Sequence, residues 1–153
     1  YEVCGIAEYS YPAGYYDLVV SNLALHYLAD LDDIYRKVFS TLRPGGVFLF
    51  NIEHPVFTAG VREDWVRDTE GRPVCWPVDN YYYPGERTTL FLGQEVKKQH
   101  HTLTQILMGL IRCGFVLEAV EEAMPDPSML DLPGMADEMR RPMMLLVKAR
   151  KPV

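Results

Sequence analysis

Two predicted strands of this chain end in polar residues that could do chemistry. The first, YDLVVSN, turns polar at Ser21 and Asn22, and His26 follows four positions later. The second, GVFLFNI, is followed directly by Glu53 and His54. Hydroxyl and amide groups can hydrogen-bond a ligand where the backbone leaves a buried sheet, and histidine can transfer a proton near neutral pH. These strand ends are therefore the first candidates for a binding site.

The segment between the two strands decides whether their ends lie together. Its apolar residues repeat with the spacing of one face of an amphipathic helix: Leu31, Ile34, Tyr35, Val38, Phe39 and Leu42. Asp30 can cap the first turn, and RPGG at 43–46 is expected to end the helix. A strand, a helix and a strand with short connections predict a right-handed crossover and parallel pairing. Ligands of open parallel sheets bind at the carboxyl edge, which both ends would share.

A further strand tail is predicted at 3–6, before the turn residues Pro12 and Gly14. It would place Ala7 beside Asn22 and His54, around one crevice. We expect the first three sheet segments to lie side by side in the same direction. The continuous apolar runs also predict strands that are covered on both faces.

The rest of the chain adds an irregular segment and a regular end. Residues 54–98 are rich in Trp, Tyr, Pro and Gly, with short strands expected around Trp76 and over 88–92. A helix is predicted from Leu103 to Ile111, with Gly114 ending it, and strands at FVLEAVEEA and RPMMLLVKAR follow, with a loop and one helical turn between them. The pattern indicates an α/β fold and a single domain over 1–153.

Size and charge narrow the class of protein. A chain of 153 residues, 48% of them hydrophobic, fits one core, and its net charge of −6 disfavours nucleic acid as a partner. No apolar run is long enough to span a bilayer, and no signal-peptide pattern opens the chain. The three scattered cysteines suggest neither a disulfide framework nor a zinc cluster, so we expect a cytoplasmic protein without a metal. His100 and His101 are adjacent and would point apart on a helix.

The stretch YYDLVVSNLALHYLADLDDIYRKVFSTLRPGGVFLFNIEHPVF resembles class I S-adenosylmethionine-dependent methyltransferases of the small-molecule branch, from their fourth to their fifth strand. The shared features are the Y-D-x-V-x-S-x-x-x-L-H core, the helix after it and L-R-P-G-G. GFVLEAVEEA and RRPMMLLVKAR are similar to the closing antiparallel hairpin of the family. The resemblance implies a partial Rossmann-like sheet, of parallel strands plus this hairpin, with flanking helices and an aromatic-rich insertion at about 54–98.

The resemblance also implies a cofactor, S-adenosylmethionine, and residues that contact it: Ile6, Ala7, Glu8, Ser21, Asn22, Leu23 and His26. Ile6 stands where the family often has an acidic or amide residue, so contact with adenine would rest on backbone amides or on Glu8. The family's glycine-rich loop and its ribose-binding acidic residue would lie upstream of Tyr1. The chain thus resembles the C-terminal half to two-thirds of a methyltransferase domain, incomplete at its N-terminus.

Methyl transfer from a sulfonium is an in-line displacement, and its catalysis depends mostly on positioning, with a base only where the acceptor loses a proton. His54 is the first candidate for that base, and His26 is the second. Tyr27, Trp76 and Tyr82 are expected to contact a small-molecule acceptor, with the aromatic insertion covering it. Methylation of oxygen, nitrogen, sulfur or carbon stays open.

Other interpretations stay open as well. Ser21 can simply bond a strand-end backbone group, and either histidine can be structural. A nicotinamide-dependent oxidoreductase uses a similar sheet, although no Tyr-x-x-x-Lys pair occurs. A non-catalytic remnant of a methyltransferase fold would expose a sheet edge, through which it could form a homodimer.

Overall fold

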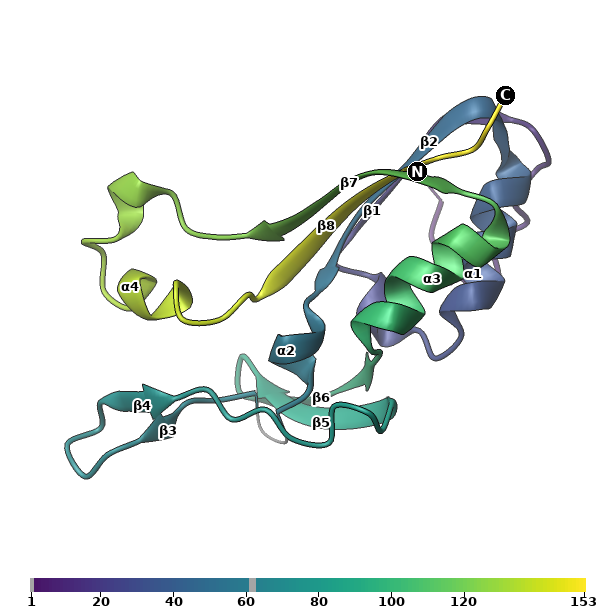
Figure 1. Cartoon of the computed structure of the whole chain (residues 1–153). Coiled ribbons are helices and arrows are strands. Elements are labelled where there is room, and N and C mark those ends of the chain that lie inside the picture. Colours follow the sequence, from purple (N-terminus) through teal and green to yellow (C-terminus); the bar gives the residue numbers. More distant parts are fainter. Residues whose placement is uncertain (1, 61–62) are drawn as a thin grey trace.

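The computed structural model describes residues 2–60 and 63–153, and a twisted four-stranded sheet runs through it (Figure 1). The strands lie in the order β1-β2-β8-β7, with β1 parallel to β2 and the other pairs antiparallel. Their bounds are Tyr16–Asn22 for β1, Leu42–Glu53 for β2, Val116–Ala123 for β7 and Met144–Arg150 for β8. The predicted α/β fold, with a parallel pair and a closing antiparallel hairpin, is confirmed.

The crossover from β1 to β2 contains a short 3-10 helix η1 (Leu25–Tyr27) and the helix α1 (Leu31–Thr41). Asp30 caps α1 as predicted, because its Oδ1 accepts from the backbone N of Asp33 at 2.9 Å. The RPGG sequence does not follow the helix as a separate turn. It lies within β2, where the register shifts from the pair Tyr16–Leu42 to the pair Leu18–Val47, so these residues bulge out of the ladder.

The second long helix, α3 (Leu103–Cys113), confirms its predicted ends. Thr102 and Gln105 form a reciprocal capping box at its start. Gly114 follows its last turn at φ 104°, a conformation that glycine adopts without steric cost. The helix packs beside α1 and leads directly into β7 (Figure 1).

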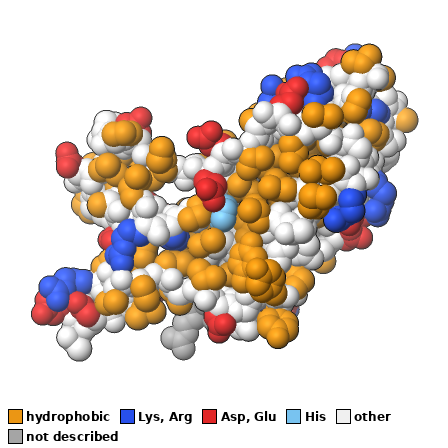
Figure 2. Space-filling view, viewed as in Figure 1, with side chains coloured by type: hydrophobic (Ala, Val, Ile, Leu, Met, Phe, Trp, Pro, Cys, Tyr) orange, Lys and Arg blue, Asp and Glu red, His pale blue; other side chains and the backbone are white. Residues whose placement is uncertain are grey.

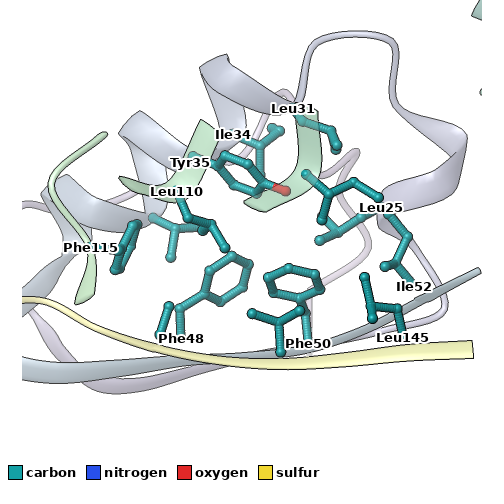
Figure 3. Close-up of a cluster of buried hydrophobic side chains, with 14 of the residues drawn as sticks. Leu25, Leu31, Ile34, Tyr35, Phe48, Phe50, Ile52, Leu110, Phe115 and Leu145 are labelled. Carbon is teal, nitrogen blue, oxygen red and sulfur yellow. The ribbon is translucent and has the colours of Figure 1, made fainter. Parts of the chain in front are cut away.

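The core lies between α1, α3 and one face of the sheet (Figure 3). Phe48, Phe50 and Ile52 alternate along β2 and point toward these helices, where Tyr35 and Leu110 meet them. The other face differs from the prediction. Leu18 and Val20 of β1 are 54% and 58% exposed, because no helix among the described residues packs on that side. The strands are covered on one face rather than two.

The aromatic-rich segment folds into one helical turn and two hairpins. After β2 come α2 (Pro55–Thr58), β3 (Val66–Arg67), β4 (Pro73–Cys75), β5 (Gly85–Phe91) and β6 (Gln94–His100). Strands near Trp76 and over 88–92 are confirmed as β4 and β5, whereas the sequence did not indicate β3 and β6. The hairpins place the insertion beyond the end of β2 (Figure 1).

The strand tail predicted at 3–6 is absent. Residues 3–5 carry no regular structure and Ile6 begins a turn, since no described strand offers this segment a ladder of hydrogen bonds. The predicted helical turn before the last strand is present, as the 3-10 helix η2 (Pro127–Met129) and α4 (Met135–Glu138). Among the described helices, none is long and apolar enough to cross a membrane.

Candidate functional site

The carboxyl ends of β1 and β2 lie side by side. Their register pairs Asn22 with Asn51, and Asn51 Nδ2 donates to Asn22 Oδ1 at 3.2 Å. The backbone N of Leu23 then donates to Asn51 O at 2.9 Å, which carries the pairing one residue past the end of β1. The parallel arrangement thus brings these two polar strand ends to one edge, as the spacing of the elements predicted.

Leu23 turns the chain sharply at this edge. Its φ of 54° lies in the left-handed region, which costs a leucine about 1 kcal/mol relative to ordinary conformations. The residue is 41% exposed, so burial of its side chain gives little compensation. Backbone strain of this kind persists where the surrounding structure holds it and is common at ligand sites.

A groove of about 470 Å³ runs along the length of β1, from Tyr16 to Asn22, and reaches this edge at Ser21 and Asn22. Ile6, Ser21 and Asn22 line it, with aromatic rings that include Tyr11 and Tyr16. Ser21 is buried, and its Oγ has no hydrogen-bond partner among the described residues. A buried hydroxyl without a partner destabilises the fold, so the groove fits a ligand that carries polar groups to that point.

His26 is buried in η1, next to Leu25, which lines the groove. Its Nδ1 accepts from the backbone N of Glu53 at 3.3 Å, which leaves the ring proton on Nε2, 4.0 Å from Glu53 Oε1. Burial, assisted by the nearby charge of Lys98, lowers the pKa of His26 to about 4. The ring is therefore neutral at neutral pH, with its acceptor nitrogen already engaged.

Next to His26 lies a buried ion cluster of Glu53, Lys98 and Glu63. Lys98 Nζ is 2.6 Å from Glu53 Oε1 and 3.1 Å from Glu63 Oε2, and its side chain is 3% exposed. Burial raises the pKa of both glutamates. Burial alone would lower the pKa of Lys98, but the two carboxylates outweigh it and raise that pKa.

Each glutamate of this ion cluster also keeps a buried oxygen, Glu53 Oε2 and Glu63 Oε1, without a partner among the described residues. Glu53 belongs to the end of β2, and Lys98 to β6. The cluster thus ties the β5–β6 hairpin to the sheet end that the groove reaches.

His54 caps α2. Its Nδ1 accepts from the backbone N of Val56 at 3.0 Å, and its Nε2 lies 2.9 Å from Glu122 Oε1. Burial lowers the pKa of His54, and the opposing effect of Glu122 is smaller. The ring is neutral and positioned by the backbone, and its assignment as a base stays a prediction.

The other predicted cofactor and acceptor residues are more scattered. Ala7 and Glu8 lie in an exposed turn, where Ala7 O accepts from Lys37 Nζ at 2.9 Å. Tyr27 is 46% exposed, with its ring 4.5 Å from that of His26. Tyr82 is 84% exposed, and its ring meets that of Tyr81 edge-on. Ile6, Ser21 and Asn22 line the groove, whereas Ala7, Glu8, Leu23 and His26 lie outside its lining.

Trp76 lies in a second cleft, beyond α2. Its ring stacks on Phe57 at 5.0 Å and an interplanar angle of 14°, and its Nε1 donates to Val56 O at 3.1 Å. The guanidinium of Arg141 lies 4.3 Å from the centre of the same ring. Sequence reasoning did not identify Arg141, because the aromatic rings that its guanidinium contacts are distant in the chain.

Lys98 was also missed, although the sequence carries a signal for it. Val96, Lys98 and His100 alternate along one face of β6, so a charged residue shares the buried face of a strand. A charge in such a position requires a buried partner. His100 binds Thr58 Oγ1 at 2.7 Å and His101 binds Leu28 O at 2.8 Å, which makes both histidines structural. In the part of the chain that the structure describes, no group of three potential ligands could hold a metal ion.

The chain is similar in sequence and in structure to known methyltransferases. The sequence profile of a methyltransferase domain matches residues 1–50. A protein from Listeria monocytogenes described as an S-adenosylmethionine-dependent methyltransferase is 46% identical, with a TM-score of 0.95 over 100% of this chain and 69% of that one. A second S-adenosylmethionine-dependent methyltransferase, from Mesorhizobium loti, is 42% identical, with a TM-score of 0.89 over 99% of this chain and 69% of that one.

A curated relative, an uncharacterised protein of Haemophilus influenzae, is 28% identical over 145 residues. The match covers 92% of this chain and 56% of that protein, so the chain spans a little over half the length of this relative.

Proposed function

Because the chain belongs to the family of S-adenosylmethionine-dependent methyltransferases, we propose that it takes part in methyl transfer from this cofactor to a small-molecule acceptor. One observation carries the proposal for the site. Ser21 lines the groove at the carboxyl end of β1, two residues before the strained turn at Leu23, and its buried Oγ has no partner among the residues that the structure describes.

The residues of this edge fit the cofactor. Ser21 and Asn22 offer a hydroxyl and an amide to its polar methionine part, while Ile6 gives an apolar wall suited to the adenine ring. We propose further contacts from Ala7, Glu8 and Leu23. When bound, the cofactor supplies a methyl group on a positively charged sulfur, and a nucleophile of the acceptor can bond the methyl carbon in line while the carbon–sulfur bond breaks and S-adenosylhomocysteine leaves.

The proposed catalysis rests on positioning. His26 is held neutral and in one orientation by the backbone of Glu53, so it adds no positive charge beside a sulfonium. His54 stays the proposed base for acceptors that must lose a proton. Because its Nδ1 already accepts from Val56, proton removal requires the loss of that hydrogen bond. We therefore expect positioning to contribute more than base catalysis.

Calorimetry with S-adenosylhomocysteine tests the proposal, on the longest form of the protein that its gene encodes. We expect saturable binding to the wild type, and a Kd about 2–10-fold higher for Ser21→Ala, the effect of one lost hydrogen bond. Ser40→Ala, the same change at an exposed position of α1, serves as the matched control and leaves the Kd unchanged. No binding by the wild type, or binding of NAD alone, contradicts the proposal.

A second candidate function is self-association without catalysis. It is favoured by β1, an outer strand of the described sheet on which Leu18 and Val20 are half-exposed. Pairing of two such edges would give the outer backbone groups of β1 hydrogen-bond partners and bring Leu18 and Val20 beside side chains of the second copy. Light scattering should then report a homodimer that Val20→Lys converts to a monomer, and a wild-type monomer at all concentrations would contradict it.

A further inference from the structure

A cleft of about 300 Å³ lies outside the groove described above. It belongs to the region where α4 lies opposite the β3–β4 hairpin (Figure 1), and Figure 2 shows Lys or Arg side chains between these two parts. Six of the residues that line it are Val56, Trp65, Trp76, Val78, Arg140 and Arg141. This volume is at the lower end of what small-molecule sites enclose. The cleft therefore suits a compact ligand.

Aromatic rings form the walls of the cleft. Trp65 meets Trp76 edge-on at 5.4 Å and 80°, and Phe57 stacks on the ring of Trp76. The indole of Trp76 is fixed by its hydrogen bond to Val56 O. Rings held at right angles in this way present one flat face and one edge, a shape that a planar ring can fill.

Arg141 supplies the polar group of the cleft. Its side chain is 4% exposed, and its two terminal nitrogens donate to Glu138 at 2.6 and 3.0 Å. Its Nε is buried as well, but has no partner among the described residues. Because a buried donor without an acceptor is costly, this N–H marks a position for an acceptor atom of a ligand.

Arg140 holds the two sides of the cleft together. Its Nη1 donates to Pro73 O and to Asp137 Oδ1, both at 2.9 Å, and its Nη2 donates to Val74 O. These bonds join the segment of α4 to β4. The guanidinium also lies 4.7 Å from the ring centre of Trp65, so a second guanidinium, paired with Asp137, borders the same space.

Val56 and Arg141, on two sides of the cleft, are both close in sequence to residues that meet at the carboxyl end of β2. Val56 follows His54 by two residues, and the backbone N of His54 donates to the carbonyl of Met143 at 2.8 Å. Met143 in turn lies two residues after Arg141. The cleft therefore adjoins the sheet edge to which the proposed methyl transfer is assigned.

We propose that this cleft binds a small flat aromatic carboxylate, with one carboxylate oxygen accepting from Arg141 Nε and the ring against Trp76 and Trp65. Asp137 and Glu138 each pair with one of the two guanidinium groups, which leaves Arg141 Nε as the available donor. A donor on a charged group binds an ionised oxygen more strongly than a neutral one, so a carboxylate is favoured over a neutral acceptor. The inference deepens the proposed function by naming the class of methyl acceptor. Only the role of the ligand as acceptor rests on the proposed function, and its binding in the cleft does not.

The chain contains only two tryptophans, Trp65 and Trp76, and both line the cleft. Their two indole N–H signals in a ¹⁵N NMR spectrum therefore report on its occupancy directly. Quinoline-2-carboxylate is the probe, and quinoline is the same ring without the carboxylate. We expect both signals to shift saturably with the first probe, and its Kd to be about tenfold lower than that of quinoline.

Arg141→Lys keeps the positive charge but removes Nε, and should abolish the tenfold preference for the carboxylate. The matched control is Arg112→Lys, an exposed arginine paired with Asp32, which should preserve the preference. Trp65→Phe gives a second variant that retains the Trp76 signal as a reporter and should weaken the binding of both probes. For each variant, the backbone amide signals far from the cleft are compared with those of the wild type, to check that the fold is unchanged.

Indole signals that do not move at millimolar probe overturn the proposal, and so does equal affinity for the two probes. A preference that survives Arg141→Lys overturns the assignment to Nε. The titration contains no S-adenosylhomocysteine, so its failure leaves the cofactor test unaffected. Failure of the cofactor test, in turn, would leave a cleft that still binds the probe.

Discussion

The two ends of the β1–β2 pair differ in how their polar groups are satisfied. At the amino end, Lys151 Nζ donates to the carbonyls of Phe39 and Leu42, both at 2.7 Å, and Arg150 Nη1 donates to Gly45 O at 2.7 Å. Basic side chains thus bind the carbonyls of the bulge and of the last helical turn before it.

At the carboxyl end, three buried side-chain atoms have no hydrogen-bond partner among the described residues: Ser21 Oγ, Asn51 Oδ1 and Glu53 Oε2. Both ends belong to the same two strands, so the geometry of the sheet does not explain the difference. Unpartnered polar groups destabilise a fold and are retained where something else provides the partner. The amino end is therefore structural, and we propose that a ligand supplies the missing partners at the carboxyl end.

The largest expected effect comes from the ion cluster at the carboxyl end. Lys98→Met leaves Glu53 and Glu63 buried without a cation, and should lower the free energy of unfolding by about 3–5 kcal/mol. Urea unfolding measures it. The neighbouring variant Lys97→Met removes only an exposed pair with Glu86 and should cost less than about 1 kcal/mol.

The deficit of Lys98→Met should depend on pH. Both glutamate pKa values are raised in the folded protein, so their unfavourable charge is present at high pH and is removed by protonation as the pH falls. The deficit should therefore be smaller at pH 5 than at pH 8. Equal losses for Lys98→Met and Lys97→Met would contradict a buried cluster.

His26 gives the next effect, as a pH dependence of stability. Its pKa is lowered from 6.5 to about 4 in the folded protein, so between these pH values the unfolded chain binds the proton and the folded chain does not. Acidification from pH 7 to 4 should cost the wild type about 3 kcal/mol more than it costs His26→Gln. Parallel curves of unfolding free energy against pH would show that His26 is not buried as described.

Ser21→Ala distinguishes ligand binding from stability. Since the hydroxyl has no partner in the fold, its removal should leave the free energy of unfolding within about 1 kcal/mol of the wild type, or raise it. Affinity for S-adenosylhomocysteine should nevertheless fall. A large loss of stability in thermal unfolding would mean that Ser21 bonds the protein itself.

The smallest effect is expected at the amino end. Arg43→Gln removes an exposed ion pair with Asp17, at 2.9 Å, and should change the free energy of unfolding by less than about 1 kcal/mol. Affinity for S-adenosylhomocysteine should be unchanged, measured by the same calorimetry. A clear loss of affinity would remove the functional distinction between the two ends.

Much of the fold could be predicted from local patterns. The helix over 31–41, the cap at Asp30 and the end at Gly114 follow from apolar spacing and cap chemistry, which act within a few residues. The same reasoning failed over 3–6, because a short apolar run forms a strand only where a partner exists. It also missed β6, a strand whose sequence QEVKKQH is mostly polar.

The candidate site was predictable only in part. Ser21 and Asn22 could be found because strand ends follow from the order of elements. The ion cluster could not, since Lys98 meets Glu53 and Glu63 across 45 and 35 residues of chain. The contact of Arg141 with Trp76 is equally nonlocal, and depends on where α4 and the β3–β4 hairpin lie.

The position of β8 has a kinetic consequence. It is last of the strands in chain order, yet it pairs with β2 on one side and β7 on the other. Until β8 inserts, the sheet consists of two unconnected parts, and its pairing with β2 closes a loop of roughly a hundred residues, which is entropically slow. We therefore expect the docking of β8 to limit the rate of refolding. The segment with η2 and α4, which joins β7 to β8, keeps the two strands close during this step.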